Sequence, residues 1–539
     1  MADTDPVSRR GVLRTTLGAG AGMLLPSVLD LNVARTRAED ASLASRTVPM
    51  TYEALAEHAR ALAAGPHRPR PDDLPAPLAA LTYDGYRAIV FRREASPRLG
   101  RFFSAQLFHR GFLHGKRVAL FLQPKAGPPR AIAYDSGQFD LGTALAGQSF
   151  PADLGFGGFR LHYAFDRGRP DAQEEFLVFL GASYFRLRGK GQEYGLSARG
   201  AAIGTGASGP EEFPDFTAFW ICEPDSEAGE VTILALLESP SLTGAYRFTV
   251  EPGDPARMSV AASLHPRKAI AQLGLAPLTS MFLHGQNGPG ARGAKPLDDF
   301  RPQVHDSDGL VVATPGDRLW RPLTNGRGSA QVSAFAVYPL EGFGLLQRER
   351  SFAAYLDVEA RQEARPGLWV APERGFGTGA IQLFEIPSVE EYADNIVAAF
   401  VPRAPVEAGR PLALAYTLTT VGAEPSAVLP GTLARVVSTR VGSPDGLRPV
   451  KPPIPGRRLY TVDFSGPGLP ADGAGLSPSV SASHGTMVDP VLEHIRQTGG
   501  WRLYVEWRPP AKMPAGDVVL RARLMLGERP VSETWDAAA

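Results

Sequence analysis

Short apolar runs separated by turn residues fill most of the chain from residue 83 onward. Such runs lie at residues 118–122, 176–180, 231–237 and 246–250, with Gly, Pro and Asp between them. Apolar runs of this length between turn residues are typical of β-strands. Because the pattern continues without a break to about residue 401, we expect one large β-sandwich domain over residues 49–401.

A second series of runs follows the Pro-rich segment 402–411, which we interpret as a linker. These runs lie at residues 412–418, 459–464, 501–507 and 518–526. Their number and spacing predict an immunoglobulin-like β-sandwich over residues 412–539. A short helix is expected at 489–497, because Asp489 can cap it and Pro490 suits its first turn.

The clearest helical pattern lies at residues 49–65. Thr51 is placed to cap the helix, and Tyr52, Leu55, Ala59 and Leu62 fall on one face. Gly65 and Pro66 end it. We expect this helix to pack against the β-domain.

Composition limits the classes of ligand. The 56 basic and 56 acidic residues cancel, and no long block of like charge occurs, so nucleic acid is an unfavourable partner and a neutral ligand is favoured. Cys222 is the only cysteine, which excludes an intrachain disulfide and a thiolate metal site. The histidines show no HExxH spacing. We expect neither a metal nor a cofactor.

The N-terminus has the order of an export signal. Arg9 and Arg10 follow Ser8, a weakly apolar run occupies 17–29, and polar residues come next. This order predicts a twin-arginine signal over residues 1–38, cleaved near Ala38, and a partnership with the twin-arginine export machinery. The apolar run is too short to span a bilayer, so we expect a periplasmic protein without stable membrane insertion.

Two acidic peptides are candidates for chemistry. His305, Asp306 and Asp308 lie within four positions, and Glu391 and Asp394 lie three residues apart. Neighbouring carboxylates raise one another's pKa, as functional sites often require. An Asp-Ser-Asp-Gly run is also a common turn, and an acidic segment is often only a solvated surface. The sequence alone does not bring Asp306 and Asp394 together.

Several longer peptides carry a resemblance to a known family. They are PADLGFGGFRLHY at 151–163, FLGASYFR at 179–186, GLSARG at 195–200, SPSLTGAYRF at 239–248, LAPLTSMF at 275–282, FRPQVHDSDGL at 300–310, GFGLLQRER at 342–350, DNIV at 394–397 and SETW at 532–535. The chain resembles the osmoregulated periplasmic glucan biosynthesis proteins, the OpgG/OpgD (MdoG) family, over essentially all of its mature length. The twin-arginine signal favours the D branch of that family over the G branch.

The resemblance implies a mainly β fold. It consists of a large N-terminal super-sandwich, similar to galactose mutarotase, joined to a C-terminal immunoglobulin-like domain. It also implies action on the β-1,2-linked glucan backbone, with members acting as inverting endo-β-1,2-glucanases and some relatives as transglycosylases. A homodimer is compatible with it.

The resemblance also assigns residues. Asp394 would be the general acid and Asp306 the general base, with carboxyls about 6.5–9.5 Å apart, or farther if a water relay intervenes. Glu391 would bind sugar hydroxyls and help to raise the pKa of Asp394, and Arg348 and Tyr355 would contact the ligand. Gln362 replaces a tyrosine of the family near the path of the attacking water, and the segment after Gly285 carries a Gly- and Pro-rich insertion reaching Pro296.

Three functions therefore remain open. The first is an inverting β-1,2-glucanase. Because Gln362 lies in the region that decides whether water or a sugar hydroxyl attacks, a cyclising β-1,2-glucan transglycosylase is an alternative to it. The second is a glucan-binding scaffold without catalysis. The third, a mutarotase or epimerase, rests on fold analogy alone.

Overall fold

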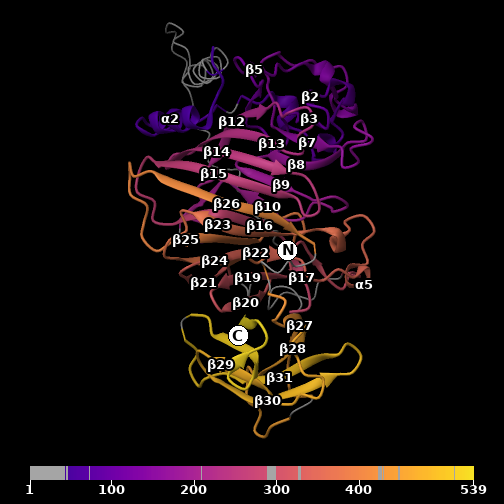
Figure 1. Cartoon of the computed structure of the whole chain (residues 1–539), viewed down its shortest axis with the longest axis vertical. Coiled ribbons are helices and arrows are strands. Elements are labelled where there is room, and N and C mark those ends of the chain that lie inside the picture. Colours follow the sequence, from indigo (N-terminus) through magenta and orange to yellow (C-terminus); the bar gives the residue numbers. More distant parts are fainter. Residues whose placement is uncertain are drawn as a thin grey trace, which may run out of the picture.

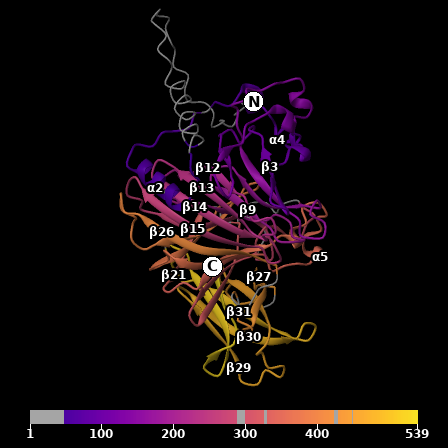
Figure 2. The ribbon, with the colours of Figure 1, turned by 45° about the horizontal axis from the view of Figure 1, so that its top comes forward.

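The chain is mainly β, as the apolar runs predict. The computed structural model describes Leu43 and residues 47–539 apart from 72, 208, 288–298, 326–328, 423–427, 429, 447–448 and 515. The molecule is elongated, with helix α2 near one end and the strands β28–β31 at the other (Figure 1; Figure 2). The expected export signal at 1–38 and most of the insertion after Gly285 lie outside the described residues.

Two large sheets form the main body. The 11-stranded sheet contains, in spatial order, β2 (Arg98–Leu99), β3 (Phe103–Phe108), β7 (Gly158–Tyr163), β8 (Glu174–Leu180), β9 (Tyr184–Leu187), β10 (Ser197–Arg199), β16 (Leu273–Ser280), β25 (Ile396–Pro402), β24 (Gly379–Glu385) and β21 (Gln331–Val337), with β11 (Ala201–Ile203) beside β16.

The 15-stranded sheet is built mostly from antiparallel neighbours. In spatial order it contains β29 (Leu476–Ala482), β32 (Val519–Leu526), β34 (Thr534–Ala538), β20 (Asp317–Pro322), β19 (Gly309–Thr314), β22 (Gly342–Leu346), β23 (Gly367–Arg374), β26 (Leu412–Val421), β15 (Arg257–Pro266), β14 (Leu242–Glu251), β13 (Val231–Glu238), β12 (Asp215–Cys222), β4 (Ala119–Gln123) and β5 (Arg130–Ala131), with β33 (Arg529–Pro530) beside β32.

Smaller elements complete the fold. They are the pairs β1 (Val90–Phe91) with β6 (Phe139–Asp140) and β17 (Phe282–His284) with β18 (Val304–His305), the helices α2 (Tyr52–Ala63), α3 (Ala76–Ala79), α4 (Tyr83–Arg87) and α5 (Phe352–Tyr355), and 3₁₀ turns at Arg93–Ala95, Ser136–Gln138, Thr143–Leu145 and Gln362–Ala364. Among the described residues, no helix is long and apolar enough to cross a membrane.

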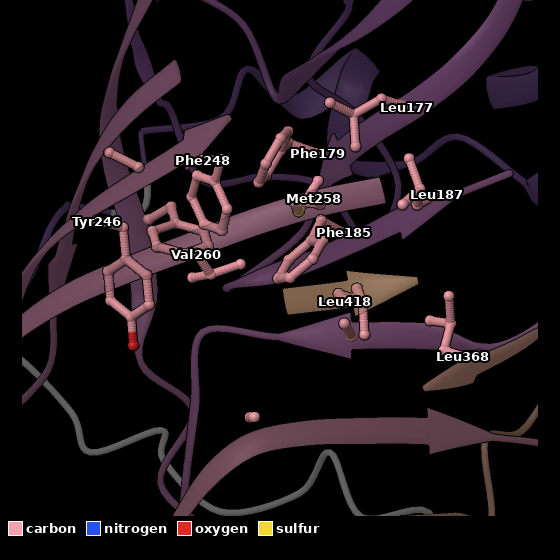
Figure 3. Close-up of a cluster of buried hydrophobic side chains, with 14 of the residues drawn as sticks. Leu177, Phe179, Phe185, Leu187, Tyr246, Phe248, Met258, Val260, Leu368 and Leu418 are labelled. Atoms are coloured by element: carbon pink, nitrogen blue, oxygen red, sulfur yellow. The ribbon is translucent and has the colours of Figure 1, made fainter. Parts of the chain in front are cut away.

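The main core lies between the two large sheets. Alternate residues of each strand point inward, so Phe179 and Phe185 of one sheet meet Phe248 of the other with ring centroids 5.2–5.4 Å apart. Figure 3 shows these rings pointing toward one another, with Leu177 and Leu187 beside them. Apolar burial of this kind is the main favourable term in folding.

Helix α2 forms as expected. The Thr51 hydroxyl accepts a hydrogen bond from the Ala54 backbone N–H at 3.1 Å, which caps the helix. Leu55 and Ala59 are fully buried in a cluster that includes Trp220 of β12. The helix therefore covers the outer face of the larger sheet.

The sheet pairing corrects the expected domain boundary. Strand β26, expected to open the smaller domain, pairs along its length with β15 and with β23. Residues 412–421 therefore belong to the larger sheet, which extends beyond the segment 402–411. A run of apolar residues shows that a strand forms but not which strands it joins, and this is why the sequence misplaced β26.

The C-terminal part has its own core. A four-stranded sheet of β27 (Arg435–Gly442), β28 (Arg458–Ser465), β31 (Gly500–Arg508) and β30 (Thr486–Ile495) packs on β32 and β34. The expected helix at 489–497 is wrong, because this segment is most of β30. Its antiparallel pairing with β31 outweighs the local helix signals, and Asp489 lies at a register shift, where a proline is tolerated.

Two leucines test the importance of the inter-sheet core. Leu177 is fully buried, and Leu113 is 77% exposed. We expect Leu177→Ala to lower the free energy of unfolding by about 2–5 kcal/mol, because it leaves a cavity. Leu113→Ala should change it by less than about 0.5 kcal/mol. Denaturant unfolding followed by fluorescence measures both, and equal losses would contradict the assigned core.

Candidate active site

The backbone next to both Asp306 and Asp394 is hydrogen-bonded to one short segment, Ser280–Phe282. The backbone N–H of Asp306 donates to the Met281 carbonyl at 2.9 Å, and that of Asn395, the neighbour of Asp394, donates to the Ser280 carbonyl at 3.1 Å. These contacts bring together two aspartates that are far apart in the sequence.

The Asn395 side chain fixes this arrangement. Its Oδ1 accepts from the Phe282 N–H at 2.8 Å, and its Nδ2 donates to the carbonyls of Phe282 at 3.0 Å and Ile386 at 2.9 Å. Nδ2 also lies 3.2 Å from the Asn325 Oδ1. Asn395 is buried, so these polar groups have little access to water as an alternative partner.

Asp306 lies at the end of β18 and is only 8% exposed. Its Oδ1 accepts a hydrogen bond from Nη1 of Arg365. The guanidinium of Arg365 is itself held by the Ala360 carbonyl, which accepts from Nε at 3.0 Å and from Nη2 at 2.8 Å. The negative charge of Asp306 is therefore compensated within the protein.

Asp394 has a different environment. Asp394 is exposed to solvent, so a ligand can reach it. The protein around it still removes much of its hydration, and this burial raises the pKa of the Asp394 carboxyl. The nearby positive charge of Arg186 lowers that pKa, the negative charge of Asp306 raises it, and Arg199 lowers it; the net shift is upward.

Arg186, Arg199 and Tyr184 are neighbours of Asp394 that the sequence reasoning missed. Arg199 lies over the Tyr184 ring at 5.2 Å, and the Nε of Arg186 donates to the Ser197 hydroxyl at 2.8 Å. Asp394 raises the pKa of Tyr184 through its charge, although burial is the larger cause. The alternation of polar and apolar residues in β9 could have identified Tyr184 and Arg186 as outward-facing side chains.

His305 and Asp308 have structural surroundings. His305 is fully buried, its ring stacks on Phe282 at 5.2 Å, and burial lowers its pKa to about 4, so it is neutral near pH 7. Asp308 accepts from the backbone N–H groups of Arg348 and Glu349 at 2.9–3.1 Å. The Asp308 carboxylate thus joins this peptide to residues 348 and 349, about 40 positions later in the sequence.

Glu391 is paired with Arg301. Nη2 of Arg301 lies 2.8 Å from the Glu391 Oε2 and 2.8 Å from the Asp299 Oδ2, and Nη1 lies 3.0 Å from the Asp357 Oδ2. One guanidinium thereby joins three segments around the site. The carboxylate that raises the pKa of Asp394 is Asp306, which corrects the expected contribution of Glu391.

Arg348 points toward the C-terminal part of the chain. Its Nη1 donates to the Glu533 Oε1 at 2.6 Å and to the Val436 carbonyl at 2.9 Å, and its guanidinium carbon lies 3.7 Å from the centre of the Trp320 ring. The side chain is almost fully buried. This arrangement gives Arg348 a role in joining the two parts, and its expected contact with the ligand stays a prediction.

Tyr355 and Gln362 are fully buried. The Tyr355 hydroxyl donates to the Glu349 carbonyl at 3.1 Å, and its ring meets the edge of His305. Among the described residues, neither amide atom of Gln362 has a hydrogen-bond partner. Buried amides are almost always bonded, so the Gln362 side chain has the capacity to hold a water molecule.

Comparison with known proteins identifies relatives over most of the chain. The family model described as "Periplasmic glucan biosynthesis protein, MdoG" matches residues 50–538. A "Glucans biosynthesis protein G" from Rhodopseudomonas palustris is 42% identical over 88% of this chain and 91% of its own length. A "Glucans biosynthesis protein D 1" from Ralstonia nicotianae is 39% identical over 98% of this chain and 97% of its own.

The chain therefore belongs to the MdoG family of periplasmic glucan biosynthesis proteins. Its place is the periplasm, and its role lies in the biosynthesis of periplasmic glucans. Relatives from both the G and the D branch match, so assignment to the D branch remains a prediction.

The Asn395 contacts can be tested by stability measurements. We expect Asn395→Ala to lower the free energy of unfolding by about 3 kcal/mol, because each buried group left unpaired costs about 1–3 kcal/mol. Ser280→Ala, which removes one hydroxyl bonded to Ser307 at 2.9 Å, should cost only about 1 kcal/mol. Denaturant unfolding of both variants checks this order, and a neutral Asn395→Ala would contradict the structural role of Asn395.

Proposed function

We propose that this protein is an inverting endo-β-1,2-glucanase in which Asp394 is the general acid and Asp306 the general base. The observation that carries the proposal is the unequal environment of the two carboxyls. Asp394 is accessible and has a raised pKa, whereas Asp306 is buried and paired with Arg365. Two carboxyls in such different environments are typical of an acid and base pair.

In the proposed reaction, water attacks the anomeric carbon from the face opposite the glycosidic bond. Asp306 takes a proton from this water, directly or through a water relay, as the new C–O bond forms. The old C–O bond breaks, and its oxygen leaves with the proton of Asp394. Attack from the opposite face inverts the configuration at the anomeric carbon.

The raised pKa of Asp394 suits this role because a general acid must hold its proton near the working pH. Arg365 suits the role of Asp306 because a guanidinium stabilises a carboxylate that has yet to accept a proton. The like charge of Asp306 also favours the protonated form of Asp394, so each carboxyl supports the state that the other needs.

The proposed substrate rests on kinship and composition. Both relatives are named for glucan biosynthesis, and the resemblance narrows the glucan to a β-1,2-linked backbone. Equal numbers of acidic and basic residues suit a neutral polymer. Export through the twin-arginine route, proposed from Arg9 and Arg10, would deliver the folded enzyme to that substrate.

We expect Asp394→Asn to lower kcat on linear β-1,2-glucan at least about 100-fold, because an amide cannot donate the required proton. Glucan binding should persist. Mass spectrometry of the products and calorimetric titration with glucan measure the two effects. Asp308→Asn is the control, since the Asp308 carboxylate accepts from the backbone N–H groups of Arg348 and Glu349 and has no part in the proposed reaction.

The products distinguish the alternatives. Shorter linear oligosaccharides support hydrolysis, whereas products lighter by one water indicate cyclising transglycosylation. Binding without turnover by the unmodified protein would favour the scaffold, and full activity of Asp394→Asn would refute the acid assignment.

The charge of Arg186 should control the pH profile. Because Arg186 lowers the pKa of Asp394, Arg186→Gln should raise that pKa. The acid must be protonated to act, so the decline of kcat at high pH should move to higher pH in the variant. Kinetics over a pH series measure this shift. Arg98→Gln, on the edge strand β2, should leave the profile unchanged, and a shift of Arg186→Gln to lower pH would contradict the proposed acid.

A further inference from the structure

We propose that Arg301 is a positioning residue that couples the proposed acid to the proposed base. It acts through two separate chains of contacts, one leading to the segment of Asp394 and one leading to Asp306. This inference rests on the proposed function and adds to it the group that sets the geometry of the two carboxyls relative to each other.

Arg301 belongs to the peptide of the proposed base, five residues before Asp306. Nε and Nη2 of its guanidinium donate to Asp299, Nη1 donates to Asp357, and both Nη1 and Nη2 donate to Glu391. These bonds use the full donor capacity of a guanidinium. The side chain of Arg301 is only 15% exposed, so water competes weakly for the same donors.

The charges of this cluster persist at neutral pH. The hydrogen bonds from Arg301 lower the pKa of the Asp299 carboxyl to about 2. The backbone N–H of Ala360 and the guanidinium of Arg301 lower the pKa of the Asp357 carboxyl, although burial opposes them. Both aspartates are therefore ionised and hold Arg301 by charge-assisted hydrogen bonds.

The first chain of contacts leads to the proposed acid. Residues 389–394 lie on the surface, where Val389 is 69% exposed and Tyr392 is 84% exposed. Among the described residues, Arg301 makes the only hydrogen bonds between 389–394 and a distant part of the chain, to Oε1 of Glu391 at 3.2 Å and to Oε2 at 2.8 Å. A surface segment with few buried contacts moves easily, so the position of Asp394 depends on this bidentate contact.

The second chain of contacts leads to the proposed base. Nη1 of Arg301 donates to Oδ2 of Asp357 at 3.0 Å, and Oδ1 of Asp357 accepts from the backbone N–H of Ala360 at 2.8 Å. The Ala360 carbonyl accepts from Nε and Nη2 of Arg365 at 3.0 and 2.8 Å. Nη1 of Arg365 donates to Asp306. Arg301 therefore helps to place the guanidinium that holds the base.

Because the two chains meet at one guanidinium, the acid and the base are held relative to a common group. An inverting reaction needs both carboxyls in reach of their oxygens at the same moment. A misplacement of about 1 Å can lower the rate about 100-fold. The charges that shift the pKa of Asp394 are those of Arg186, Asp306 and Arg199, so the contribution of Arg301 is geometric.

We expect Arg301→Met to lower kcat on linear β-1,2-glucan by about 10- to 100-fold, because both carboxyls lose a common support. This fall should exceed any change in KM. The decline of kcat at high pH should stay in place, in contrast to its shift in Arg186→Gln. Arg301→Lys should recover part of the loss, since an ammonium keeps the charge but lacks the planar fork of donors.

Arg361→Met is the matched control. Arg361 lies between Asp357 and Arg365 in the sequence and pairs with Glu193 at 2.6 Å, but its side chain is 49% exposed and outside both chains of contacts. We expect this variant to keep its full kcat. Steady-state kinetics over a pH series measure all of these effects.

A second substrate separates the two chains of contacts. In a β-1,2-gluco-oligosaccharide with a 4-nitrophenyl leaving group, the C–O bond can break to release the nitrophenolate anion without a proton from the acid, whereas the attacking water still gives a proton to the base. Glu391→Gln should therefore lower kcat on glucan much more than on this substrate. Asp357→Ala should lower kcat on both.

The outcomes distinguish this role from a structural one. Unchanged kcat in Arg301→Met, or equal losses on both substrates in Glu391→Gln, would overturn the positioning role. The combined loss in Arg301→Met with Asp357→Ala should be smaller than the product of the single losses, because the two residues act through one contact. No cleavage of either substrate by the unmodified protein would overturn the proposed function and this role with it, whereas cleavage that tolerates Arg301→Met would overturn the role alone.

Discussion

The hydrogen bonds of Asn395 are the constraint on which the candidate site depends. They fix the start of β25 to the segment Ser280–Phe282, and the same segment binds the backbone of Asp306. A site built on two distant loops would need both loops to be rigid. Here the buried amide of Asn395 holds the residue next to Asp394 to the same segment that binds the backbone of Asp306, so both aspartates are anchored to one common element.

The alternation of apolar residues was sufficient to predict a β fold and most strands, and the cap and apolar face of α2 predicted that helix. Strand partners could not be predicted, because β26 looks the same whether it joins β15 or a separate domain. Segment 489–497 shows the converse error. Its Asp and Pro suit a helix start, but pairing with β31 determined the structure.

The candidate site was predicted by resemblance more than by spacing. No periodicity links Asp306 to Asp394, because their proximity depends on Asn395 and on sheet order. The partners of charged side chains could not be predicted from the sequence either. Arg348 looked available for a ligand, yet its partner Glu533 lies 185 positions away. Arg186, by contrast, could have been found, because the alternation in β9 places it outside the core.

The C-terminal part is connected to the strands next to the candidate site. Strand β34 joins β20 in parallel, and the buried Arg321 of β20 donates to Asp536 at 2.9 Å and lies 3.4 Å from Glu385. Glu385 pairs with Ile396, the residue after Asn395. Removing one partner from a buried ion pair costs about 3–5 kcal/mol, so this arrangement strongly favours one position of the C-terminal part. Through Arg321 and Glu385, the C-terminal part therefore helps to hold β24 and the start of β25, which directly follows Asp394 and Asn395.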